Sequence, residues 1–154
     1  MEAKKIFMQR AIELARQSAA QGDYALGAVI VKGDEVIAES TTNLKHENDP
    51  TVHAEVVVIR NACRKLETRN LEGCILYTTH EPCSMCASAA IWAKMDGIVY
   101  GATIHDAEGK SGTKFTWRQI NIRCRDVLKE GTPKLELVEE FMRDECVKLF
   151  ALSQ

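Results

Sequence analysis

Two short groups of residues in this sequence could do chemistry together. His53 and Glu55 open the run HAEVVVIRNACRKL, and Cys83 and Cys86 lie in the segment HEPCSMC. Each group precedes a stretch of helix-forming residues, so each is expected where a helix begins. A helix N-terminus offers unpaired N–H groups and a positive dipole end, which stabilise thiolates. We therefore expect Cys83 and Cys86, which at i and i+3 share one helical face, to be metal ligands.

His53 could complete a site with three protein ligands. Nitrogen and sulfur ligands with a fourth position left open suit zinc. Water at such a position has a pKa of about 7, and its proton needs an acceptor that is not itself a ligand. Glu55 is placed for that role. The pattern H-x-E followed by P-C-x-x-C is the signature of zinc deaminases of nucleobases, and the segments 53–55 and 82–86 contain every required residue.

Other interpretations of these residues stay open. A thiol-redox C-x-x-C protein would need neither His53 nor Glu55. A zinc-stabilised interaction domain without catalysis would need a fourth ligand, and a glutamate beside an open metal position argues against it. Candidates for that fourth ligand are His46, His80 and His105. The remaining cysteines have apolar or helical neighbours and are expected to be small core residues: Cys63, Cys74, Cys124 and Cys146.

The composition is that of a globular protein. The chain has 154 residues, of which 45% are hydrophobic and 27% charged, with a formal net charge of -2. This length can bury a core without disulfides, and the charge does not resemble a strongly basic nucleic-acid surface. No segment approaches the roughly 18 apolar residues of a membrane span, and the charged N-terminus lacks the apolar core of a signal peptide. We expect one cytoplasmic domain over residues 1–154.

The elements that position the candidate residues alternate in type. Helical spacing predicts helices at 4–20, 52–66 and 83–94, a short one near 123–130, and a last one in EEFMRDECVKLFAL. Runs of β-forming residues predict strands at 26–32, 35–41 and 73–79, and in IVYGA and KLELVE. Gly33-Asp34 predicts a hairpin turn, and 43–50 and 103–119 are expected to be loops. The order predicts an α/β fold, a three-layer α/β/α sandwich around a five-stranded mixed sheet.

Two longer segments resemble the cytidine-deaminase-like superfamily: NDPTVHAEVVVIRNACRKL and LYTTHEPCSMCASAAIWAKMDGIVYGA. Within it they are most similar to the branch that holds guanine deaminases, fungal-type cytosine deaminases and tRNA adenosine deaminases. The resemblance implies the three-layer fold, one Zn²⁺ per chain held by His53, Cys83 and Cys86, Glu55 as general acid and base, and commonly a homodimer.

The resemblance also implies substrate contacts. Asn43 matches an asparagine that hydrogen-bonds the base, although an ordinary turn residue is the alternative. Ala54 matches a position whose backbone N–H contacts a base carbonyl. Guanine deaminases have a tryptophan like Trp92 in the base pocket and an aspartate like Asp106. The alternatives are that Trp92 is a core residue on the inward face of its helix and that Asp106 is a solvated loop acid.

The sequence indicates the type of reaction more clearly than it indicates the substrate. The tRNA enzymes share EPCSMCASA and LELVEEFMRDECVKLF, but usually carry basic residues after the last helix, where this chain ends FALSQ. They also typically have histidine in place of Trp92. The guanine deaminases share NDPTVHAE and IWAK, but have an aromatic C-terminal tail and usually phenylalanine in place of Leu26. We expect a small-molecule substrate, a free purine with guanine first. Cytosine or cytidine, or adenosine in single-stranded nucleic acid, are the alternatives.

Two further expectations concern the surroundings of the site. The loop 103–119 is expected to cover the pocket mouth, where Phe115, Trp117 and Arg118 would contact a base or sugar, or instead line a dimer interface. Glu81, next to the Pro-Cys turn, is expected to be structural rather than catalytic.

Overall fold

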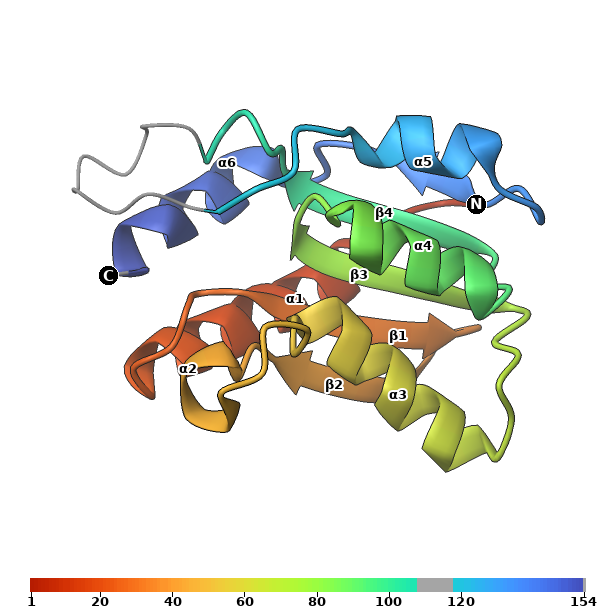
Figure 1. Cartoon of the computed structure of the whole chain (residues 1–154), viewed down its shortest axis with the longest axis horizontal. Helices are drawn as coiled ribbons and strands as arrows, with labels where there is room; N and C mark the ends of the chain where they lie inside the picture. Colours follow the sequence, from red (N-terminus) through yellow and green to blue (C-terminus); the bar gives the residue numbers. More distant parts are fainter. Residues whose placement is uncertain (108–117, 154) are drawn as a thin grey trace.

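The centre of the molecule is a five-stranded mixed sheet with the order β2-β1-β3-β4-β5 (Figure 1). The computed structural model describes residues 1–107 and 118–153. β1 (Gly27–Lys32) pairs antiparallel with β2 (Glu35–Thr41) and with β3 (Cys74–His80). β4 (Gly97–Ala102) and β5 (Glu136–Val138) extend the sheet in parallel. The predicted mixed sheet and the hairpin between the first two strands are confirmed.

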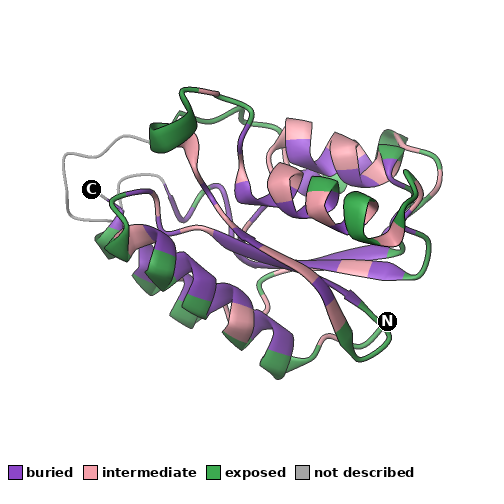
Figure 2. Cartoon of the chain, turned by 90° about the horizontal axis from the view of Figure 1, so that it is seen from below, coloured by how far each residue is buried: buried purple, intermediate pink, exposed green. Residues whose placement is uncertain are grey.

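Helices cover both faces of this sheet, which gives the predicted three layers (Figures 1 and 2). One face carries α3 (Ala54–Leu66), α4 (Ser84–Trp92) and α5 (Cys124–Glu130). The other carries α1 (Lys5–Ala20), α6 (Arg143–Val147) and its 3-10 continuation η1 (Lys148–Leu152). Each face has its own buried apolar cluster, one around Val58, Ala90 and Leu128 and the other around Met8, Cys146 and Phe150.

The approach of α1 to β1 depends on a glycine. β1 is buried along all but its last residue, as expected for a central strand. A Cβ on Gly27 would lie 2.2 Å from the carbonyl oxygen of Ala11. Only glycine lets the helix backbone come this close to the strand.

Two predicted elements differ from the structure. The expected loop 43–50 contains one helical turn, α2 (Leu44–Glu47). The last helix begins only at Arg143, because the N–H of Phe141 donates to the carbonyl of Tyr100 at 2.9 Å and so holds the preceding segment against β4. Glu140 and Met142 have positive φ there, which interrupts the helical pattern. In the described ranges, no helix is long and apolar enough to cross a membrane.

The cysteines outside the two groups pack mostly as predicted. Cys74, Cys124 and Cys146 are buried, whereas Cys63 is partly exposed on α3. All are free thiols. They behave as small apolar residues of the two clusters.

Candidate metal centre and active site

The two groups singled out in the sequence meet where α3 and α4 begin. His53 is the N-cap residue of α3 and Cys83 is the N-cap residue of α4, both with extended backbone. Cys86 lies in the first turn of α4 and is buried. The helix starts thus bring one imidazole and two sulfurs together from positions 30 and 33 residues apart.

The spacing of the three ligand atoms fits a zinc ion. The Sγ atoms of Cys83 and Cys86 are 3.6 Å apart, and His53 Nδ1 lies 3.7 Å and 3.5 Å from them. Tetrahedral zinc, with bonds of about 2.3 Å to sulfur and about 2.0–2.1 Å to nitrogen, would place its ligand atoms about 3.5–3.8 Å apart. No fourth His, Cys, Asp or Glu joins this group in the described parts of the chain. The three residues would therefore hold the ion with one coordination position open.

The protonation of the cluster follows from its hydrogen bonds. The hydrogen bond with Cys86 lowers the pKa of the Cys83 thiol to about 4, against the opposing effect of burial, and the His53 ring lowers it further. The same sulfur–sulfur hydrogen bond, with burial, raises the pKa of Cys86. The pKa of His53 is raised, mainly by its hydrogen bond with Cys83. One sulfur is thus a ready thiolate ligand, and metal binding has to displace the proton from the other.

Glu55 lies beside the ligands without being one of them. It belongs to the first turn of α3 and is 4% exposed. Its Oε2 is 3.6 Å from Cys86 Sγ, while Oε1 accepts a hydrogen bond of 2.8 Å from the Thr78 hydroxyl. A buried carboxylate held next to an open metal position can move protons to and from a bound substrate.

Comparison with known protein families decides what kind of site this is. The family described as "Cytidine and deoxycytidylate deaminase zinc-binding region" matches residues 1–102, a range that contains His53, Glu55, Cys83 and Cys86. The chain belongs to this family. It is a zinc-dependent deaminase, which sets aside the redox and the non-catalytic interpretations.

Similar proteins share the chemistry and differ in substrate. The guanine deaminase of Bacillus subtilis (strain 168) is 43% identical over 117 residues, 75% of each chain. The tRNA-specific adenosine deaminase of the same organism is 38% identical over 146 residues, 95% of this chain and 85% of its own. A solved structure of guanine deaminase from Nitrosomonas europaea matches with a TM-score of 0.80 and 25% identity, covering 98% of this chain and 84% of the other.

Two of the predicted substrate contacts, Ala54 and Asn43, lie at the starts of helices. Ala54 is fully buried and is the first residue of α3, so its N–H has no intrahelical acceptor. Asn43 is the N-cap residue of α2, and its Nδ2 donates to Glu47 Oε1 at 3.0 Å. In the structure, Asn43 thus makes a local contact within α2, as expected of an ordinary turn residue. That either residue binds a base stays a prediction.

The deaminase places Trp92 away from the ligand cluster. Trp92 is the last residue of α4, whereas Cys86 lies in the first turn, and its side chain is 84% exposed. The interpretation of Trp92 as an inward-facing core residue is wrong, because α4 turns Cys86, Ala87 and Ala90 toward the sheet instead. That the indole contacts a base stays a prediction.

Asp106 is buried in an ion pair. Its carboxylate accepts hydrogen bonds from Arg143 Nε and Nη2, at 2.9 Å and 2.5 Å, and from the N–H of Thr103 at 2.9 Å. The Arg143 guanidinium holds the pKa of Asp106 well below its usual range. The interpretation of Asp106 as a solvated loop acid is wrong, since the residue is 3% exposed. Its contacts join the segment after β4 to α6, and a contact with substrate stays a prediction.

Two hydrogen-bonded pairs near the site were not predicted from the sequence. Thr78 bonds Glu55, and Arg123 bonds Glu81, whose carboxylate is fully buried. Two sequence features could have suggested these contacts: a threonine in a buried strand, and an acidic residue directly before the Pro-Cys pair. Of the loop residues, Arg118 is exposed, and Phe115 and Trp117 lie outside the described residues.

Proposed function

We propose that this deaminase acts on a free purine base, with guanine first, and replaces an exocyclic amine by a carbonyl. The observation that carries the chemistry is the placement of Glu55, buried and 3.6 Å from Cys86 Sγ but outside the ligand set. The sequence similarity to guanine deaminase supports the substrate.

Glu55 performs the proton transfers of the proposed reaction. Zinc held by His53, Cys83 and Cys86 supplies Lewis acidity, which makes a water molecule nucleophilic at neutral pH. Glu55 would accept one proton of that water and pass it to the ring nitrogen, and would then take the remaining hydroxyl proton and pass it to the departing amine. The C–N bond breaks, ammonia leaves, and the oxygen of the water becomes the new carbonyl. Thr78 holds Oε1, so Oε2 is the oxygen that faces the ligand cluster.

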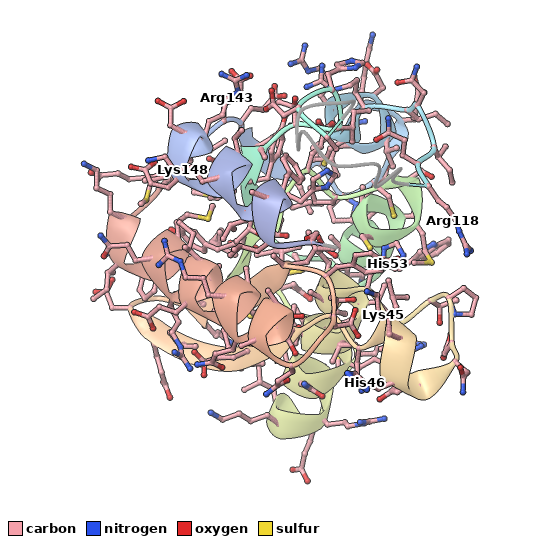
Figure 3. The ribbon with its side chains drawn as sticks, turned by 90° about the vertical axis from the view of Figure 1, so that its left-hand side faces the viewer. Lys45, His46, His53, Arg118, Arg143 and Lys148 are labelled. Atoms are coloured by element: carbon pink, nitrogen blue, oxygen red, sulfur yellow. The ribbon has the colours of Figure 1, made fainter. Side chains whose placement is uncertain are left out.

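The charge around the C-terminus favours a small substrate over RNA. Binding of a phosphate backbone depends on cations that face it. Residues 143–153 contain two cations, Arg143 and Lys148, and Arg143 is bound to the buried Asp106. Both lie well apart from His53 in Figure 3. These two residues therefore give no sign of a phosphate-binding surface at the metal site.

A second candidate is deamination of adenosine in tRNA. The observation in its favour is that the match to the tRNA-specific relative covers 95% of this chain. A homodimer and a cytoplasmic location also stay predictions. The exposed indole of Trp92 is the first residue to test in a dimer interface, since tryptophan is enriched at protein–protein interfaces.

Ammonia release from a panel of substrates tests the proposal. The panel contains guanine, guanosine, cytosine, cytidine, adenine, adenosine and an RNA hairpin with a loop adenosine. We expect guanine to be turned over with the highest kcat/KM. Turnover of the hairpin alone would establish the second candidate, and turnover of cytosine or cytidine alone would overturn the purine assignment.

A further inference from the structure

Glu81 occupies an unusual place next to the metal ligands. It directly precedes Pro82 and Cys83 and is fully buried. Its backbone N–H donates to the carbonyl of Ala102 at 2.7 Å, which fixes the residue against the end of β4. A buried carboxylate is tolerated only when donors surround it.

The groups that donate hydrogen bonds to the Glu81 carboxylate come from two places far apart in the chain, just after β4 and at the start of α5. The N–H of Ile104, just after β4, donates to Oε1 at 3.1 Å. The N–H of Cys124, where α5 begins, donates to Oε2 at 2.8 Å. Arg123 Nε donates to the same oxygen at 3.0 Å. One carboxylate therefore ties the Pro82-Cys83 turn to the exit of β4 and to the start of α5.

Arg123 extends this attachment into a larger network. Its Nη2 donates to the Tyr100 hydroxyl at 3.2 Å, and that hydroxyl donates to Glu139 Oε2 at 2.5 Å. Glu139 also binds Arg125 at 2.8 Å. Through Arg123 and Tyr100 the turn before Cys83 is thus connected to β4 and to Glu139, the residue that follows β5.

We propose that Glu81 is a positioning residue of the metal site, which holds the turn that carries Cys83 and so sets how slowly zinc leaves. Zinc leaves when a ligand moves away, and motion of the turn that carries Cys83 would move its sulfur away from the ion. Groups that orient metal ligands from outside commonly change metal affinity by about 10–100-fold when mutated. The inference concerns metal retention and does not depend on which base the enzyme takes.

The structure offers a matched control. Glu81 and Asp106 are both buried carboxylates that bind one arginine and backbone N–H groups. The hydrogen bonds of Asp106 join it to Thr103 and, through Arg143, to α6, and among the described residues none of them reaches the turn before Cys83. Glu81→Gln and Asp106→Asn should therefore both lower thermal stability, but only Glu81→Gln should speed the loss of zinc.

The experiment measures zinc release from the zinc-loaded variants into an excess of a coloured chelator, with thermal unfolding recorded on the same samples. We expect release from Glu81→Gln to be about 10-fold faster than from wild type, and release from Asp106→Asn to stay within about twofold. In zinc-buffered solution that keeps the site full, Glu81→Gln should recover the kcat that it loses when its zinc is released.

A second variant keeps the test decisive if Glu81→Gln does not fold. Arg123→Gln removes one donor and leaves both backbone N–H groups on the carboxylate, so we expect a smaller acceleration of zinc release. Wild-type release rates in the folded variants, or equal acceleration in Asp106→Asn, would overturn the proposal. A kcat that stays low with zinc saturated would also overturn it, since Glu81 would then act on the reaction rather than on the metal.

Discussion

Glu55 Oε2 and Cys86 Sγ lie 3.6 Å apart, although the two residues are 31 positions apart in the chain. They come from the first turns of two different helices, α3 and α4. The contact places the proton-transfer group of the deaminase at the edge of its metal cluster without making it a ligand. The orientation of the carboxylate is then set from β3, through Thr78.

Thr78→Val removes this orienting hydrogen bond. Thr78 is almost fully buried, and valine has nearly the same shape, so the main change is that Glu55 Oε1 loses its 2.8 Å donor. One hydrogen bond is worth about 1 kcal/mol, so we expect kcat to fall about 3- to 10-fold with zinc content unchanged. Thr78→Ser keeps the hydroxyl and should stay near wild type. Wild-type kcat in the valine variant would show that the bond does not orient Glu55.

Removal of zinc should abolish activity and lower stability together. A ligand that binds only the folded state adds to the free energy of unfolding, so chelation should lower Tm and stop ammonia release. Addition of one Zn²⁺ per chain should restore both. Cys86→Ser should lose the metal, whereas Cys146→Ser, a buried thiol outside the cluster, should keep it. Full activity in thoroughly metal-free protein would contradict the site assignment.

The Asp106–Arg143 pair predicts a pH dependence of stability. Arg143 holds the pKa of Asp106 well below its usual range, while the unfolded carboxyl titrates near about 4. The stabilisation is therefore complete above that pH and is lost as the pH falls from about 4 toward the folded pKa. Asp106→Asn should lower the free energy of unfolding by about 2 kcal/mol at pH 7. Below pH 4 its stability should fall less steeply than that of wild type in urea unfolding. Parallel pH profiles would show that the pair contributes no such stability.

Gly27→Ala tests the contact between α1 and β1. The added Cβ would meet a backbone oxygen at 2.2 Å, so α1 would have to move. Overpacking of this kind costs about 1–3 kcal/mol, which denaturant unfolding can measure. Gly33→Ala is not a neutral control because φ is positive there. An exposed alternative is Gln17→Ala on α1, which should change stability little. Equal stability of Gly27→Ala and wild type would show that the helix is not held closely.

Local sequence patterns were enough to predict most of the fold and the three metal ligands. Strands and helices followed from apolar periodicity, and His53, Cys83 and Cys86 followed from spacing, because ligand chemistry restricts residue type strongly. The partners of Glu81 and Asp106 could not be predicted, since an acid beside a turn has the same local pattern whether it is solvated or buried against a distant arginine. The outward orientation of Trp92 could not be predicted from the sequence either. Which side of α4 faces the sheet depends on packing, because this short helix is apolar on every side.

The most direct test of the account is ammonia release by wild type, Glu55→Gln and Glu67→Gln, with zinc measured on each sample. Glu67 lies exposed at the other end of α3 and serves as the control. Loss of the general acid and base should lower kcat by about 10²–10⁴-fold, with zinc still bound at one ion per chain. Glu67→Gln should match wild type. A Glu55→Gln variant that keeps its zinc and deaminates within a few-fold of wild type would contradict the role of Glu55 and the mechanism built on it.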